Sequence, residues 1–215
     1  MSLSTEFKSH DVAHHFESAK QEFDACKLGM WAFLAQEILF FSGLFVAYII
    51  FRMQHFEMFK YASELLDWRM GALNTLVLIA SSFTMAMGVR SAQTSQKKAT
   101  IRYLILTFIF AGMFMCVKYF EYSSKFHHGY LPAQFFDAAA PFETLHLYFG
   151  LYFTMTALHG LHVLIGMGLI FWLIRRAKRG EFHSEYYTPV EMVGLYWHLV
   201  DLIWIFLFPL LYLIT

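Results

Sequence analysis

The sequence predicts an all-α protein that crosses a membrane as a bundle of five transmembrane helices. Hydrophobic residues make up 58% of its 215 residues and charged residues only 15%, a balance typical of integral membrane proteins. Apolar runs bounded by charge must be helical, because in hydrocarbon each backbone amide has to be satisfied within its own segment. The expected spans are residues 28–52, 71–90, 101–121, 143–174 and 190–213.

Each run has its own length and boundaries. The first, "MWAFLAQEILFFSGLFVAYIIF", carries a single formal charge, Glu37. The second ends at Arg90, and the polar stretch "SAQTSQKKAT" at 91–100 is typical of a hairpin that leads to the third. A mixed loop at 122–142 separates the third run from the fourth. The fourth exceeds the ~20 residues that a span needs, so we expect that helix to tilt or project from the bilayer before the fifth run follows.

The distribution of Lys and Arg predicts how the chain is threaded. Eleven of the 16 basic residues fall on the side of the N-terminus, including the cluster "RRAKRG" at 175–180, and such residues concentrate on the cytoplasmic side. We therefore expect residues 1–27 to form an N-terminal cytoplasmic segment without a cleaved signal peptide. Residues 28–215 form the transmembrane domain, and an odd number of spans places the C-terminus outside.

Composition also excludes several classes of function. Sixteen basic and 16 acidic residues give a net charge of zero, so bulk electrostatics do not favour nucleic acid as a partner. The two cysteines, Cys26 and Cys116, have no spacing typical of a disulfide framework or a metal site. No internal repeat is visible, which removes the inverted-repeat pattern of secondary transporters.

Glu37 is the first candidate for function, because an ionisable group inside a span is costly. At ~1.5 Å per residue it lies about 14 Å along a helix that crosses ~30 Å of hydrocarbon. No Lys or Arg is expected near mid-depth, so burial favours the protonated carboxyl. We expect it to be hydrogen-bonded within the bundle, with His159 or His162 as its partner.

Charged residues at the ends of two spans are the next candidates. Lys118 and Glu121 are three residues apart and can pair across one helical turn, or each can extend separately to water. Arg175 and Arg176 are basic residues at the cytoplasmic end of the fourth span, which indicates topology and also offers a phosphate-binding site for an anionic phospholipid.

Histidines raise the question of a metal or haem. His159 and His162 lie three apart on one helical face, and a stand-alone membrane cytochrome or metal enzyme could use them with His146 and His198. A neutral imidazole inside a membrane protein also bonds readily to a neighbouring helix, and we favour that structural role, with no metal or redox cofactor in this chain. A third class, a small transporter, would use Glu37 and Asp201.

Five segments carry a resemblance that covers all the expected spans. They are "LAQEILFFSGLFVAY", "LNTLVLIASSFT", "FEY" at 120–122, "LHGLHVLIG" and "YWHLVDLIWIFLF". In this order they resemble subunit III of the haem-copper terminal oxidases, in the short five-span bacterial form of cytochrome c and quinol oxidases. The longer members have two further spans at the N-terminal end.

The resemblance implies a specific function. Subunit III binds no haem or copper, packs on oxidase subunit I, and supports proton uptake and stability while the complex reduces O2 to water and pumps protons. It implies a multi-pass protein of the bacterial inner membrane, with the other oxidase subunits and membrane lipids as partners. The polar residues singled out in or near the spans, beside the buried carboxyl Glu37, are Glu121, His159, His162, Glu191, His198 and Asp201.

Overall fold

The computed structural model describes residues 14, 16–130, 142 and 144–214, and this part of the chain folds into helices. Five of them are long and apolar enough to cross a membrane, which confirms the predicted all-α fold class. The helices are α1 (Ala19–Gln54), α2 (Phe56–Glu64), α3 (Trp68–Gln93), α4 (Lys97–His127), α5 (Leu145–Lys178) and α6 (Thr188–Tyr212).

The helices differ from the expected spans at their ends. The first begins nine residues early, at Ala19, within the expected N-terminal segment, because Ser18 caps it by accepting the Gln21 amide at 3.2 Å. The third span, helix α4, continues to His127 and makes the start of the predicted 122–142 loop helical, while residues 131–141 of that loop lie outside the described residues. Hydropathy marks the hydrocarbon, whereas caps and polar helix formers extend a helix beyond it.

The short helix α2 was not predicted from the sequence. Its nine residues are too few for a span, and they follow α1 directly. The helix is nevertheless well buried on one side, where the Phe59 ring meets Tyr48 of α1 at 5.3 Å and Tyr148 of α5 at 5.2 Å. Helix α2 therefore covers one end of the bundle.

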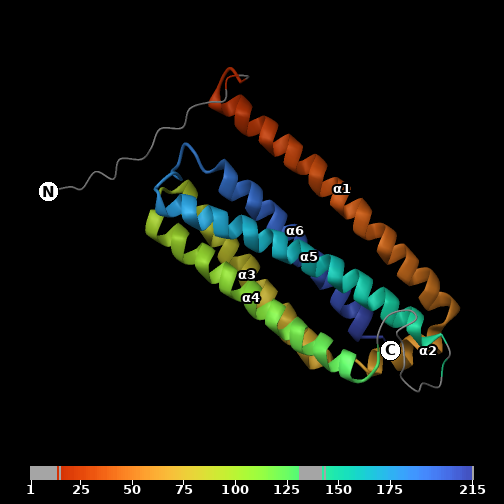
Figure 1. Ribbon diagram of the computed structural model, residues 1–215. Coiled ribbons are helices and arrows are strands. Elements are labelled where there is room, and N and C mark those ends of the chain that lie inside the picture. The colour runs from red at the N-terminus through yellow and green to blue at the C-terminus, as the bar shows by residue number, and fades with distance from the viewer. Residues whose placement is uncertain (1–13, 15, 131–141, 143, 215) are drawn as a thin grey trace.

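The long helices run roughly along one another, with α3, α4, α5 and α6 forming the bundle and α1 lying along its edge (Figure 1). We call the end at which α1 begins the N-side, and the end at which α6 finishes the C-side. The α3–α4 hairpin is the most extensive helix pair, and α6 contacts α1, α3 and α5. In consequence α6 is the central helix, and more of its span is buried than that of the other described spans.

Helix α1 contacts the bundle along one stripe. Its buried residues, Leu34, Phe41 and Tyr48, recur every seven residues. At the N-side, Lys27 pairs with Glu191 of α6 at 3.5 Å. At the C-side, the Tyr48 hydroxyl donates a hydrogen bond to the carbonyl of Leu210 in the last turn of α6.

Gly166 of α5 packs tightly against a side chain of α6. A Cβ at Gly166 would lie 2.5 Å from Cζ3 of Trp197, whose side chain is completely buried. Two residues further along α5, a Cβ at Gly168 would meet nothing within 4 Å. The two glycines lie on the same helix and differ in whether an added Cβ would meet a neighbouring side chain, so they serve as test and control.

We predict that Gly166→Ala lowers the free energy of unfolding by about 1–3 kcal/mol, because the bulky indole of Trp197 has to shift. Gly168→Ala should be neutral or stabilising by up to about 1 kcal/mol, since alanine favours helix. Thermal unfolding in detergent, followed by far-UV circular dichroism, measures both. Equal effects of the two substitutions would contradict the close α5–α6 approach.

Candidate functional site

Glu37 and His162 form a polar pair between α1 and α5. Glu37 Oε2 lies 3.1 Å from His162 Nε2, and the two side chains are 12% and 15% exposed. The His162 ring also packs edge-on against Phe41, with ring centroids 5.2 Å apart. One of the two partners expected for Glu37 is thus in place, and it joins the edge helix to the bundle.

The hydrogen bonds of His162 define the proton in this pair. Its Nδ1 lies 2.7 Å from the Leu158 carbonyl oxygen, which can only accept, so Nδ1 carries a proton. The contact between Nε2 and the Glu37 carboxyl then needs one proton between them, held either by the carboxyl or by the imidazole. In both cases the pair as a whole is neutral, which suits its place inside a membrane.

A cleft of about 450 Å³ opens beside this pair. Apart from Glu37 and His162, its walls are mainly apolar. They come from α1, α5 and α6 and comprise Met30, Phe33, Ile165, Leu169, Val193 and Tyr196. The carboxyl is therefore reachable by a small apolar reagent, although it is shielded from bulk solvent.

His159, the other expected partner of Glu37, is not in this pair. It is 1% exposed, and its ring lies 5.5 Å from that of Phe114 and 5.3 Å from that of Trp204. Neither of its ring nitrogens has a hydrogen-bond partner among the described residues. The spacing of His159 and His162 on one face did not show that the two rings point to different neighbours.

The remaining polar candidates, His198 and Asp201, both lie on α6. His198 Nδ1 is 2.7 Å from the Ser82 hydroxyl, and Asp201 is one turn further along α6. Within the part of the chain that the structure describes, no group of three or more His, Cys, Asp or Glu residues is arranged to hold a metal ion. The four-histidine hypothesis therefore has no common site in the described residues.

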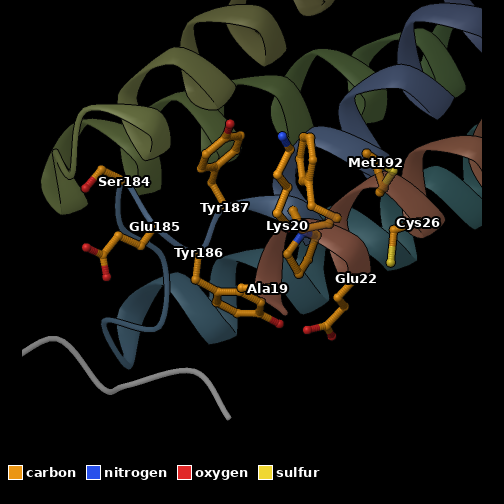
Figure 2. A pocket seen from close by; sticks show the side chains of 12 residues that line it. Ala19, Lys20, Glu22, Cys26, Ser184, Glu185, Tyr186, Tyr187 and Met192 are labelled. Carbon is orange, nitrogen blue, oxygen red and sulfur yellow. The ribbon is translucent and has the colours of Figure 1, made fainter. Parts of the chain in front are cut away.

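Glu191 lies in the first turn of α6, at the N-side. Figure 2 shows the pocket between the start of α1 and the segment that leads into α6. Beside the ion pair of Glu191 with Lys27, the Phe23 ring lies 5.9 Å from that of Tyr187. A pocket of about 340 Å³ adjoins these contacts, and the free thiol of Cys26 is on its wall. These contacts fix the start of α1, and they explain why the helix extends beyond the hydrocarbon.

Lys118 and Glu121 form the second polar site, at the C-side. Lys118 Nζ lies 2.9 Å from Glu121 Oε2, and the side chains are 7% and 3% exposed. The predicted pairing is confirmed, whereas the alternative that each reaches water separately is wrong. Because α4 continues to His127, the two residues lie inside the bundle and not at its edge.

Two tyrosines that were not predicted from the sequence complete this site. Lys118 Nζ donates to the hydroxyls of Tyr152 at 3.0 Å and Tyr212 at 3.1 Å. Both hydroxyls donate in turn to Glu121 Oε1, at 2.9 and 2.5 Å. Three helices, α4, α5 and α6, are joined in this way. Tyrosines are frequent in this chain, so only the fold identifies the two that reach the ion pair.

The basic cluster at the N-side end of α5 divides into two kinds of arginine. Arg176 is already engaged, since its Nε lies 2.5 Å from Glu181 Oε2 and its guanidinium lies 4.7 Å from the Trp172 ring centroid. Arg175 is exposed and makes no ion pair with a described residue. A pocket of about 480 Å³ lies between them and Arg179.

Comparison with known proteins gives one consistent family. A profile of the family described as cytochrome c oxidase subunit III matches residues 9–215. Cytochrome c oxidase subunit 3 of Thermostichus vulcanus is 32% identical over 209 residues, which cover 97% of this chain and 96% of that protein. A probable cytochrome c oxidase subunit 3 of Mycobacterium tuberculosis is 32% identical over 87% of each chain. A probable quinol oxidase subunit 3 of Staphylococcus saprophyticus is 28% identical over 96% of each chain.

We predict that Lys118→Met and Glu121→Gln each lower the free energy of unfolding by about 3–5 kcal/mol, because each leaves a buried polar partner uncompensated. The double variant should lose at least about 1 kcal/mol less than the sum of the two. Thermal unfolding in detergent measures the cycle, and Lys178→Met, on the exposed side of α5, is the control. Additive losses would mean that the two charges do not stabilise each other.

Proposed function

Because this chain belongs to the cytochrome c oxidase subunit III family, we propose that it is the non-catalytic subunit of a proton-pumping haem-copper oxidase. Membership makes it a multi-pass membrane component of a terminal oxidase complex, with other oxidase subunits as partners. In our proposal the chain packs on subunit I, carries no haem or copper, and supports proton uptake and durability while its partners reduce O2 to water.

The observation that carries the accessory role is that several polar side chains of the spans hydrogen-bond from one helix to another. Glu37 is bonded to His162, and His198 to Ser82. His159 packs between aromatic rings. Such residues are set to hold helices together, and this arrangement gives no support to a stand-alone cytochrome that would need His146, His159, His162 and His198 as ligands.

We propose that Glu37 carries the shared proton at neutral pH and holds α1 against α5. A neutral acid that donates to the free nitrogen of His162 avoids placing two charges in hydrocarbon. No acidic group lines the cleft beyond Glu37, which argues against an obligatory proton path through this carboxyl and against a transporter built on Glu37 and Asp201.

The proposed orientation places the N-side in the cytoplasm of a bacterium and the C-side outside. It is supported by the basic residues at the N-side ends of α3, α4 and α5, which include Arg90, Lys98 and Arg175. This orientation also puts the Lys118–Glu121 pair in the outer half of the membrane. Arg175 then lies at the depth of the inner headgroups, where an anionic phospholipid can bind.

Depletion of the chain from the oxidase tests the proposed role. Oxidase without it should keep its haem and copper and its initial rate of O2 reduction, but should become inactive several-fold sooner during turnover. Oxidase with Glu37→Gln should assemble and keep most of its turnover, because glutamine retains the bond to His162. Hydrophobic carbodiimide should label the wild-type chain and the Glu57→Gln control but not the Glu37→Gln variant.

Two results would contradict this role. Stoichiometric iron or copper in the purified chain would assign it a redox centre. Loss of nearly all turnover in a fully assembled Glu37→Gln oxidase would make the carboxyl a proton carrier.

A lipid site at Arg175 predicts a difference between neighbouring arginines. Arg175→Gln should reduce the anionic phospholipid that co-purifies with the chain, because glutamine cannot neutralise a phosphate. Arg176→Gln should leave bound lipid largely unchanged but loosen the turn that Glu181 closes. Quantitative lipid mass spectrometry of the purified complex measures the first effect, and unchanged lipid in Arg175→Gln would leave this cluster with a topological role only.

A further inference from the structure

Two polar side chains in the core of the bundle have no hydrogen-bond partner among the described residues. Asn74 of α3 is completely buried, and neither the nitrogen nor the oxygen of its side-chain amide is paired. His159 of α5 is equally well buried, and both of its ring nitrogens are unpaired. Buried polar groups are almost always hydrogen-bonded, because leaving them unpaired away from water is costly. Two such residues in one core therefore indicate a bound group that pairs with them.

Asn74 points into the interior of the bundle, between α4 and α6. It recurs at seven-residue intervals with Ser81 and Gly88, so the three buried residues share one side of α3. Ser81 accepts a hydrogen bond from Nε1 of Trp197 on α6 at 3.0 Å. A Cβ at Gly88 would lie 3.5 Å from Cβ of Tyr103 on α4. The side of α3 that carries Asn74 thus faces both neighbouring helices and the space between them.

His159 points into the same space from the opposite helix. Its ring lies 5.5 Å from that of Phe114 on α4 and 5.3 Å from that of Trp204 on α6. Helices α3 and α5 each pack against both α4 and α6, which makes them the diagonal pair of the bundle. Asn74 and His159 therefore face the interior from opposite corners.

The two residues also lie at one depth, because Trp204 connects their levels. Its ring packs on His159, and its Nε1 donates to the hydroxyl of Thr75, the residue after Asn74, at 3.1 Å. Asn74 and His159 are thus brought to the same part of the core, and the group that pairs with them lies beside the Trp204 indole.

The chemistry of the two side chains points to a neutral group that both donates and accepts. A neutral imidazole has one donor and one acceptor, and an amide has two donors and an acceptor oxygen. A second cation is disfavoured here, because the Lys118 ammonium already lies 5.2 Å from the Trp204 ring centroid. Water donates and accepts, and it is the molecule that ordinarily pairs with buried polar groups in protein cores.

We propose that the core binds water between Asn74 and His159, beside Trp204. The water accepts from one side chain and donates to the other, so it joins α3 to α5 across the bundle. The inference does not depend on the proposed function, since it rests only on residues of this chain.

Radiolytic labelling of the full-length chain, purified with any subunits that accompany it, tests for this water. A short X-ray pulse converts bound water into hydroxyl radicals, which oxidise the side chains beside it even when they are buried. Trp204 should be oxidised several-fold faster than Trp197, as assigned by tandem mass spectrometry. Trp197 is the matched control, because both indoles are completely buried and both donate to a hydroxyl of α3. Equal rates, as expected if Asn74 and His159 bond directly without water, would overturn the proposal.

A double variant tests whether the water belongs to these two residues. In Asn74→Leu/His159→Leu, oxidation of Trp204 should fall to the rate of Trp197, because leucine offers water no hydrogen bond. The control is Thr84→Val/Thr107→Val, which removes the buried hydrogen bond of 2.9 Å between α3 and α4 and should leave oxidation of Trp204 unchanged. Undiminished oxidation of Trp204 in the leucine variant would place the water elsewhere. If that variant does not fold, the comparison of the two tryptophans in the wild-type chain still decides.

Discussion

The buried ion pair between Lys118 and Glu121 is the interaction on which the C-side of the bundle depends. Lys118 has three N–H groups, and they are directed to Glu121, Tyr152 and Tyr212. The Glu121 carboxylate accepts hydrogen bonds from Lys118, Tyr152 and Tyr212. Every strong donor and acceptor in the cluster is thus satisfied, which is the condition under which a buried pair becomes tolerable. Removing a partner leaves an unpaired charge in hydrocarbon. The need to keep every partner in place fixes the relative positions of α4, α5 and α6.

At the same end of the bundle, the last backbone carbonyls of α6 and α2 also find hydrogen-bond donors. The last carbonyls of any helix lack partners within the helix, and hydrocarbon supplies none. In α6 they accept from tyrosines of neighbouring helices, with Tyr48 of α1 bonded to Leu210 and Tyr148 of α5 bonded to the Leu211 carbonyl at 2.6 Å. Lys125 of α4 donates to the Leu65 carbonyl, at the end of α2, in the same way. The polar groups that have to be paired are therefore also the groups that determine which helices are neighbours.

Sequence patterns predicted the number of spans, because hydropathy depends on composition alone. They also predicted two local facts, the Lys118–Glu121 pair within one turn and a histidine partner for Glu37. What could not be predicted depends on rotation of one helix against another. His159 and His162 share a helical face, yet His162 meets Glu37 while His159 meets Trp204. The short helix α2 was missed for a different reason, since its nine residues have neither the length of a span nor the composition of a loop.

The distribution of polar groups separates the interior of this chain from its outer surface. Inside, the Glu37–His162 and Lys118–Glu121 pairs are each neutral as units and bonded within the chain, which suits a part whose task is to remain assembled. On the outer side of α1 the amide of Gln36 has no such partner among the described residues, and Gly29 and Gly43 leave the backbone uncovered there. An unpaired polar group in hydrocarbon is costly, and among the described residues the buried side chains of Asn74 and His159 also lack a hydrogen-bond partner.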